Sequence, residues 1–286
     1  MSAEKRCVGI VGAGTMGSGI AQLLAMAGHE VVLRDLTQEA VDRGMKGIAQ
    51  SAERLSSKGR LSVEASQGLL AQIRPTLELR DVANCDIVIE AIVENYEAKA
   101  SLVRELDEVC RETAILATNT SSISVTRIAS ASKDPSRVIG MHFFNPVVLM
   151  DLVEIIPAMQ TSDATREKVV SLTESIGKTP KLTQDSYGFV VNRILIPMVN
   201  EAINCLHEGV ASAKDIDDMM KLGANHPLGP LSLADLIGLD VVRSIMETLQ
   251  RGFDDPKYRP SPLLKRMCDA GYLGRKTGRG FFTYSK

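Results

Sequence analysis

The sequence predicts an α/β protein in which a doubly wound parallel sheet, interrupted by an inserted helical hairpin, is followed by an all-helical C-terminal domain. Three observations support this prediction. Strand-like apolar runs alternate with helical segments over the first 185 residues, which is typical of a parallel sheet. A charged stretch with helical periodicity interrupts the alternation after the second run. Beyond Gly188 the helical pattern dominates.

The strands of the first domain are expected where short runs rich in Val and Ile occur. These runs cover residues 7–14, 30–35, 85–91, 114–119, 137–143, 151–158 and 180–185. Helical periodicity is found between them, at residues 18–28, 97–110 and 162–177, and in the inserted hairpin at residues 39–57 and 63–73. The alternation of the two kinds of segment predicts a doubly wound sheet over residues 1–185.

The second domain is expected to span residues 186–286. Its helices are predicted at residues 188–209, 213–222, 231–249 and 263–270. A small helical domain after an open sheet usually shapes a substrate cleft, and such helices often pair two subunits. We therefore expect a cleft-forming and dimerisation domain.

The first strand runs into a Gly-rich turn and then a helix, which is the fingerprint of Rossmann-type dinucleotide binding. Gly12 permits the tight turn, Gly14 lets the backbone approach a pyrophosphate, and Gly17 allows the helix to lie close to the strand. The helix N-terminus offers unpaired N–H groups to the phosphates. The predicted cofactor contacts of this loop are Gly12, Gly14, Thr15, Met16 and Gly17.

An acidic residue, Asp35, ends the second run at the spacing that a ribose contact requires. Its carboxylate would bind the ribose hydroxyls and repel a 2′-phosphate, which favours NAD, while the adjacent Arg34 keeps some use of NADP open. Asn119 and Glu90, at the ends of two later strands, are further predicted cofactor contacts. A helix cap or a core ion pair is the alternative role of Glu90.

The composition is that of an ordinary globular protein. The chain has 286 residues, 44% of them hydrophobic, and a net charge of −2, which gives no reason to expect nucleic acid or a membrane as partner. Its five cysteines are scattered and form no CxxC pair, so we expect reduced thiols, no disulfide framework and no metal site. With the first strand beginning close to Met1, a cytoplasmic location is expected.

His142 and Glu154 are the first candidate catalytic pair. His142 ends a strand, where open α/β sheets bind ligands, and imidazole can act as acid or base near neutral pH. Glu154 falls on the same strand face as apolar residues, where an unpaired carboxylate is costly to bury. The two could meet across a hairpin. The alternatives are a core histidine bonded to the backbone and a core ion pair for the carboxylate.

Two further polar residues are candidates for substrate contacts. Asn192 shares an apolar helical stripe with Phe189 and Ile196, and its amide requires hydrogen-bond partners that a cleft would offer. Ser121 follows a strand end in the sequence NTSS and could bind a substrate oxygen. A contact between helices is the alternative for Asn192, and a helix N-cap is the alternative for Ser121.

Arg54 and Lys58 place two cations on one face of the inserted hairpin, four residues apart. They could hold the phosphates of a large substrate. The alternative is a solvated helix face.

Taken together, the motifs GAGTMG, VVLRD, NTSS, GMHFFNP, LVE, GFVVNR, KLGANHPLGP and GRKTGRGFFTYSK resemble those of the 3-hydroxyacyl-CoA dehydrogenases, most closely the bacterial, clostridial-type 3-hydroxybutyryl-CoA dehydrogenases. The resemblance covers essentially the whole chain. It implies reversible NAD-dependent oxidation of a short-chain (S)-3-hydroxyacyl-CoA by a cytoplasmic homodimer. Tyr187, Val148 and Asp151 depart from residues common in this family, but none replaces a residue with a chemical role.

The resemblance also implies roles for individual residues. His142 would be the catalytic acid or base and Glu154 its partner, while Ser121 and Asn192 would bind the reacting part of the substrate. Arg54 and Lys58 would hold the CoA moiety. Two other functions remain as alternatives: a dehydrogenase of a free β-hydroxy acid or sugar acid, and a nucleotide-binding structural or regulatory protein without catalysis.

Overall fold

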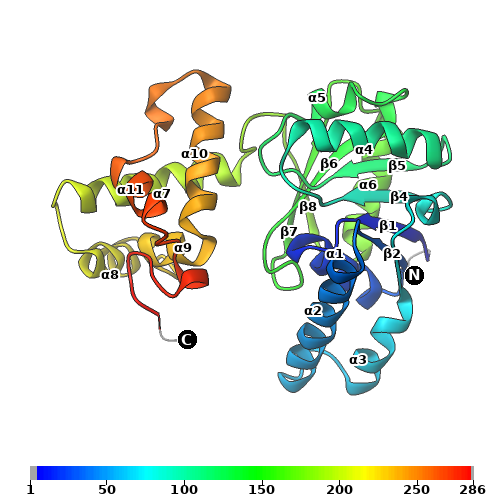
Figure 1. Cartoon of the computed structure of the whole chain (residues 1–286), viewed down its shortest axis with the longest axis horizontal. Coiled ribbons are helices and arrows are strands. Elements are labelled where there is room, and N and C mark those ends of the chain that lie inside the picture. Colours follow the sequence, from blue (N-terminus) through cyan, green and yellow to red (C-terminus); the bar gives the residue numbers. More distant parts are fainter. Residues whose placement is uncertain (1–4, 285–286) are drawn as a thin grey trace. The chain divides into compact units, whose positions relative to one another are not determined.

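Eight strands form one sheet, in the order β3-β2-β1-β4-β5-β6-β7-β8. Most of them are labelled in Figure 1. Neighbouring strands are parallel except for β6 and β7, which pair as an antiparallel hairpin. The strands are β1 (Cys7–Val11), β2 (Glu30–Arg34), β3 (Ile73–Thr76), β4 (Ile87–Glu90), β5 (Ile115–Thr118), β6 (Val138–Phe143), β7 (Leu152–Pro157) and β8 (Thr179–Leu182). The predicted doubly wound sheet is therefore confirmed.

The computed structural model describes residues 5–284, apart from the side chain of Gln67, and the chain divides into two units between Asp185 and Ser186. The helices of the first unit are α1 (Thr15–Met26), α2 (Gln38–Ser57), α3 (Val63–Leu69), α4 (Tyr96–Val109), α5 (Val125–Ala129) and α6 (Asp163–Ser175). Apolar side chains of α1, α2 and α6 join the main core cluster with alternate residues of the strands. Helices α4 and α5 belong to the other layer (Figure 1).

The inserted hairpin, formed by α2 and α3, is shorter than predicted. The expected helix over residues 63–73 ends at Leu69, a short 3-10 turn (Leu70–Gln72) follows, and Ile73 begins the edge strand β3, which the sequence did not reveal. This strand has only four residues, and two of them are Arg74 and Pro75. Proline is tolerated at a sheet edge, but it hides the strand from a search for apolar alternation.

The second unit is helical, as predicted. It contains α7 (Val191–His207), α8 (Ala213–Ala224), α9 (Pro230–Ile237), α10 (Leu239–Phe253) and α11 (Pro262–Asp269), and one cluster of buried apolar side chains joins these helices. The single helix expected over residues 231–249 is wrong: the chain breaks at Gly238, whose φ of +104° no helix can accommodate. No helix within residues 5–284 is long and apolar enough to cross a membrane.

Candidate active site

The Gly-rich loop between β1 and α1 leaves open space where a phosphate would bind. Gly12 has a φ of +106°, and a Cβ there would lie 2.6 Å from the Ala91 carbonyl oxygen, so the turn requires glycine. A Cβ on Gly17 would lie 1.7 Å from the Gly12 carbonyl oxygen. At Gly14, the N-cap of α1, no described atom lies within 4 Å of such a Cβ. The loop therefore fits a pyrophosphate against the first N–H groups of α1. The first residues of that helix are Thr15 and Met16.

Asp35 follows β2 and borders a cavity of about 460 Å³ beside the Gly-rich loop. Its Oδ2 accepts a hydrogen bond from the Ala13 N–H at 2.6 Å, and its Oδ1 accepts one from the Leu36 N–H at 2.6 Å. Arg34 borders the same cavity and donates to the Leu77 carbonyl oxygen at 3.2 Å. The apolar part of the lining consists of Leu36, Ala91, Ile92, Val93, Ala98 and Leu102. An apolar slot with a carboxylate at its rim fits the adenosine of NAD.

His142 and Glu154 face each other across the β6–β7 hairpin. They are register partners, and the His142 Nδ1 lies 2.7 Å from the Glu154 Oε2. Both residues are buried, with 5% and 2% of their surface exposed. The contact expected from the sequence is therefore present. Because the carboxylate accepts from Nδ1–H, it fixes the tautomer in which Nε2 is the basic nitrogen, and it would stabilise the ring when protonated.

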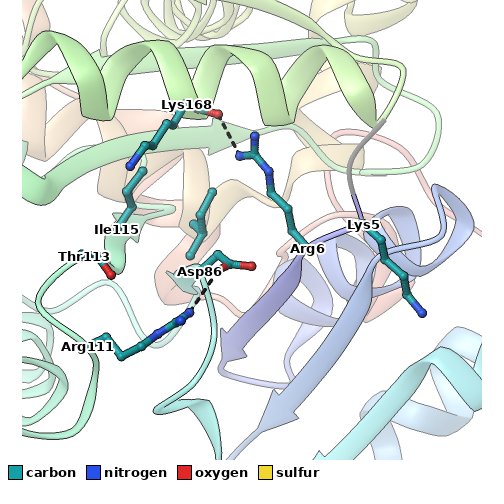
Figure 2. A pocket seen from close by; sticks show the side chains of 8 residues that line it. Lys5, Arg6, Asp86, Arg111, Thr113, Ile115 and Lys168 are labelled. Carbon is teal, nitrogen blue, oxygen red and sulfur yellow. Dashed lines mark hydrogen bonds and ion pairs between the residues drawn. The ribbon is translucent and has the colours of Figure 1, made fainter. Parts of the chain in front are cut away.

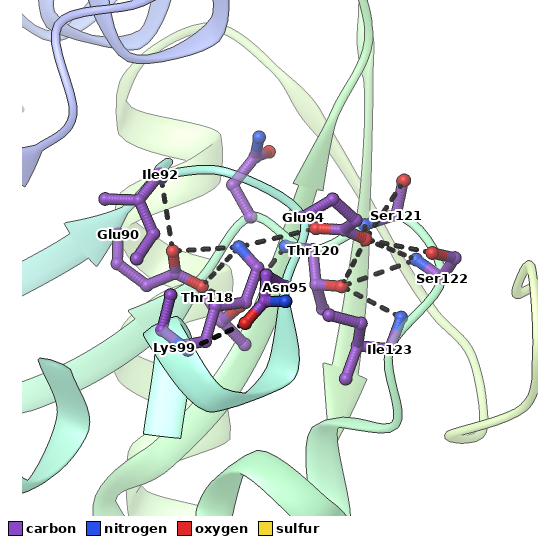
Figure 3. A network of polar contacts seen from close by, with 12 residues as sticks. Glu90, Ile92, Glu94, Asn95, Lys99, Thr118, Thr120, Ser121, Ser122 and Ile123 are labelled. Carbon is purple, nitrogen blue, oxygen red and sulfur yellow. Dashed lines mark hydrogen bonds and ion pairs between the residues drawn. The ribbon is translucent and has the colours of Figure 1, made fainter. Parts of the chain in front are cut away.

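Glu94, in the loop after β4, holds the NTSS segment in place (Figure 3). Its Oε1 accepts hydrogen bonds from the Thr120 hydroxyl at 2.7 Å, from the Ser121 N–H at 2.9 Å and hydroxyl at 3.2 Å, and from the Ser122 N–H at 3.0 Å. Burial alone would raise the pKa of Glu94, but the charge of Lys99 and these hydrogen bonds outweigh it and lower the pKa below its ordinary value. Ser121 is thus anchored by a carboxylate.

Lys99 links Glu94 to Glu90 inside the first unit (Figure 3). Its Nζ lies 2.9 Å from both carboxylate oxygens of Glu90 and 3.4 Å from the Glu94 Oε2, and its side chain is only 1% exposed. Glu90 also accepts from the Thr118 hydroxyl and from the Ile92 N–H. Glu90 therefore forms the core ion pair that the sequence left open as the alternative to a cofactor contact. With 1% of Glu90 exposed, little of its carboxylate is accessible to a ligand.

Sequence reasoning missed Glu94 and Lys99, although a signal for Lys99 was present. Lys99 falls on the buried stripe of α4, in the spacing i, i+3, i+4, i+7 that apolar residues occupy on a packed helix. The other members of that stripe are Leu102, Val103 and Leu106. A lysine in such a stripe requires buried acidic partners. Glu94 carries no comparable signal, because it lies in a loop.

The two predicted asparagines, Asn119 and Asn192, belong to different units. The Asn119 Oδ1 accepts from the Phe143 N–H at 2.9 Å, so this residue ties the end of β5 to the strand that carries His142. Asn192 belongs to the second unit, in the first turn of α7, where it is partly exposed. Of the predicted apolar stripe, Ile196 is buried on α7, whereas Phe189 is buried but precedes the helix, with a φ of +49°.

A second cavity, of about 450 Å³, lies between α1, α2 and the segment from Asn145 to Val148. Arg54 and Lys58 are both exposed, but Arg54 lines this cavity, whereas Lys58, the C-cap of α2, lies outside the lining. The lining also contains Gln22, which is 2% exposed and whose amide Nε2 has no hydrogen-bond partner among the described residues. A buried amide without a partner is costly, and a ligand carbonyl in this cavity would satisfy it.

Comparison with known proteins identifies the same family over both units. Residues 7–186 match the family described as "3-hydroxyacyl-CoA dehydrogenase, NAD binding domain". Residues 188–284 match the family described as "3-hydroxyacyl-CoA dehydrogenase, C-terminal domain".

Individual relatives are similar over nearly their whole length. A probable 3-hydroxybutyryl-CoA dehydrogenase of Deinococcus radiodurans is 53% identical over 96% of this chain and 99% of its own. A 3-hydroxybutyryl-CoA dehydrogenase of Clostridioides difficile is 50% identical over 97% of this chain and 99% of its own. The crystal structure of (S)-3-hydroxybutyryl-CoA dehydrogenase from Ralstonia eutropha superposes with a TM-score of 0.94 at 51% identity, covering 99% of this chain and 100% of that one.

Proposed function

The chain belongs to the 3-hydroxyacyl-CoA dehydrogenase family, and we propose that it catalyses the reversible oxidation of (S)-3-hydroxybutyryl-CoA to acetoacetyl-CoA with NAD. The observation that carries this proposal is the buried pair of His142 and Glu154, joined by a contact of 2.7 Å near the carboxyl end of β6. Relatives of this chain that bear the same activity in their names support the choice of substrate.

Each site residue has a defined role in the proposed mechanism. NAD, when bound, supplies the acceptor for the hydride that leaves C3 of the substrate. His142 accepts the hydroxyl proton at Nε2, and Glu154 stabilises the imidazolium that results. Ser121 and Asn192 would donate hydrogen bonds to the C3 oxygen and the thioester region, which polarises the carbonyl during reduction. Because a hydroxyl has one proton, Ser121 does so by turning its O–H away from Glu94, which still holds its N–H.

The ligands are assigned to the two cavities of the first unit. The Gly-rich loop, Asp35 and the apolar cavity beside them would hold the pyrophosphate and adenosine of NAD. The cavity lined by Arg54 and Gln22 would take the CoA part of the substrate, with Lys58 near its outer end as a further cation for phosphate. A contact of the Asp35 carboxylate with the ribose hydroxyls predicts a preference for NADH over NADPH.

The test is the oxidation of NADH by the purified protein with acetoacetyl-CoA and, separately, with acetoacetate. We expect turnover with the thioester and little with the free acid, because the free acid leaves the Arg54 cavity empty. His142→Gln should lower kcat by about 10²- to 10⁴-fold with unchanged NADH affinity, since it removes the acid/base group alone. The exposed His207→Gln serves as the matched control. Faster turnover of the free acid, or near-normal turnover of His142→Gln, would contradict the proposal.

We further infer that the active form is a cytoplasmic homodimer that associates through the second unit. Large apolar side chains are exposed there, including Leu222 at 87%, Ile194 at 67% and Met219 at 62%. Exposed apolar surface of this kind is typical of subunit interfaces. Leu222→Asp should shift sedimentation velocity from dimer to monomer. A wild-type protein that sediments as a monomer at micromolar concentration would overturn the inference.

A further inference from the structure

Two cysteines that are far apart in the sequence lie in contact. Cys7 begins β1, and Cys85 precedes β4, the strand that pairs with β1. Their Sγ atoms are 3.0 Å apart, although 78 positions separate the two residues in the chain. A disulfide bond requires about 2.05 Å between the sulfurs, so a movement of about 1 Å would join them. No spacing motif in the sequence announces this pair.

Backbone hydrogen bonds hold the two residues in this arrangement. The Cys7 N–H donates to the Asp86 Oδ2 at 3.1 Å, and the Asp86 N–H donates to the Cys7 carbonyl oxygen at 2.9 Å. The Cys85 N–H donates to the Val82 carbonyl oxygen at 3.0 Å. Both backbones are thus fixed by the sheet and its adjoining turn, so the approach of the sulfurs is built into the fold.

The two thiols differ in access to solvent. Cys85 is fully buried, and burial raises the pKa of its thiol far above the ordinary value. Cys7 is partly exposed. Its chain neighbour Arg6 and the residue after Cys85, Asp86, line a cavity of about 260 Å³ at the amino ends of the strands (Figure 2). Neither cysteine belongs to the lining of that cavity, so an oxidant has to reach the pair through the exposed part of Cys7.

We propose that Cys7 and Cys85 form a reversible intramolecular disulfide when the protein meets a hydroperoxide. The Cys7 sulfur attacks the peroxide oxygen, the O–O bond breaks, and Cys7 becomes a sulfenic acid while an alcohol or water leaves. The Cys85 sulfur then displaces the sulfenic hydroxyl, which departs as water with the Cys85 thiol proton. Two thiols lose two electrons in total, and the peroxide gains them. An external dithiol restores the reduced form.

The disulfide would lie at the amino end of β1, whereas the Gly-rich loop follows the carboxyl end of this strand. Cys7 is the first residue of β1 and Val11 is its last. Oxidation is therefore expected to leave the affinity for NADH within about twofold of that of the reduced protein. The disulfide would link β1 covalently to the residues just before β4, which reduces the number of conformations open to the unfolded chain.

Peptide mapping of the oxidised full chain tests the proposal. The reduced protein is treated with a small excess of hydrogen peroxide, alkylated, and digested with trypsin without reduction. Cleavage after lysine and arginine places Cys7 in peptide 7–34, Cys85 in peptide 81–99 and Cys110 in peptide 105–111. We expect peptides 7–34 and 81–99 to appear joined, with the loss of two hydrogen atoms, and to separate after treatment with dithiothreitol. The chain should lose two of its five thiols.

Three outcomes would overturn the proposal. The first is a Cys7 that accumulates sulfinic acid without a cross-link. The second is a link between Cys85 and Cys110, whose Sγ also lies near the Val82 carbonyl oxygen. The third is faster loss of the thiols of the second unit than of Cys7. The partly exposed Cys7→Ser should abolish the joined peptide, and Cys110→Ser, at a site with no part in the bond, should retain it.

Discussion

Two polar regions of the first unit differ in whether their buried polar groups have partners within the protein. Around Lys99, every buried charge has partners: the ammonium binds Glu90 and Glu94, and Glu94 in turn accepts from the NTSS segment. Around Gln22, a buried amide nitrogen has no partner among the described residues and borders a cavity of about 450 Å³.

The difference separates positioning from recognition. A fully paired buried network holds its groups in one geometry, which suits a segment that must present Ser121 to a reacting atom. An unpaired donor at a cavity wall carries a cost that a ligand removes, so part of the binding energy comes from satisfying the protein itself. The proposed catalytic centre therefore depends on pairing within the protein, and the proposed CoA cavity on pairing with substrate. Four variants test this contrast.

Lys99→Met should have the largest effect on the folded state. The variant keeps an unbranched side chain, one atom shorter, but leaves the Glu90 and Glu94 carboxylates without their shared cation. Removal of one partner from a buried ion pair costs about 3–5 kcal/mol. We expect a loss of this size in the free energy of unfolding, measured with urea. The exposed Lys133, which pairs with Glu108, is the control, and Lys133→Met should cost less than about 1 kcal/mol. Equal losses in both variants would refute the contrast.

Glu94→Gln should come next, because it removes charge from the anchor of Ser121 while keeping its shape. Charge-assisted hydrogen bonds are worth about 1.5–3 kcal/mol, so we expect kcat to fall by about tenfold or more. The KM for NADH should change little. An unchanged kcat in Glu94→Gln would show that Ser121 needs no carboxylate anchor.

The same variant has a defined dependence on pH. The pKa of Glu94 is lower in the folded protein than its ordinary value of 4.5, so its ionised form stabilises the fold above that pH. This stabilisation is lost as the pH falls through the folded-state pKa. The difference in unfolding free energy between wild type and Glu94→Gln should therefore be constant near neutral pH and shrink below about pH 4.5. If this difference in unfolding free energy grew at acidic pH, the pKa of Glu94 would be raised in the folded protein, not lowered.

Much of the fold follows from local sequence patterns, and the elements that were not predicted also have local causes. Alternation of apolar runs and helices predicts the sheet, and the hairpin contact of His142 with Glu154 follows from two strand assignments alone. The edge strand β3 is hidden by Pro75, and the break at Gly238 depends on a backbone angle that helical periodicity does not report. The pattern of apolar residues does not report the backbone conformation at individual positions.

The candidate site was less predictable, because its polar partners come from separate segments. The role of Glu94 depends on a loop lying against another loop 26 residues away, which no spacing rule encodes. The unpaired amide nitrogen of Gln22 depends on the packing of α1 against α2, which the sequence pattern does not report. Glu90 was predicted to contact the cofactor, but only the fold reveals that Lys99 neutralises it.

Gln22→Leu should separate recognition from stability by moving them in opposite directions. Loss of one hydrogen bond to the substrate should raise the KM for acetoacetyl-CoA by about tenfold, at roughly 1.4 kcal/mol, with kcat and the KM for NADH nearly unchanged. Because the variant also removes a buried polar atom without a partner, its thermal midpoint should equal or exceed that of wild type. Ser132, buried but hydrogen-bonded to Asp107, offers a control, since Ser132→Ala should lower the midpoint. A less stable Gln22→Leu with normal KM would mean that the amide serves the fold.

Lys58→Ala should have the smallest effect, because this cation lies outside the lining of the cavity and is exposed to solvent. The KM for acetoacetyl-CoA should rise by only about two- to threefold at low ionic strength, because solvent and salt screen the interaction of an exposed charge with the substrate. At 0.5 M salt, where the Debye length is only about 4–5 Å, the KM should approach the wild-type value. Arg54→Ala, at a residue that is also exposed but lines the cavity, should cost more, because its guanidinium can bind a phosphate through two hydrogen bonds. A Lys58 effect that equals that of Arg54 and resists salt would move the phosphate contact outward, from the cavity wall to the end of α2.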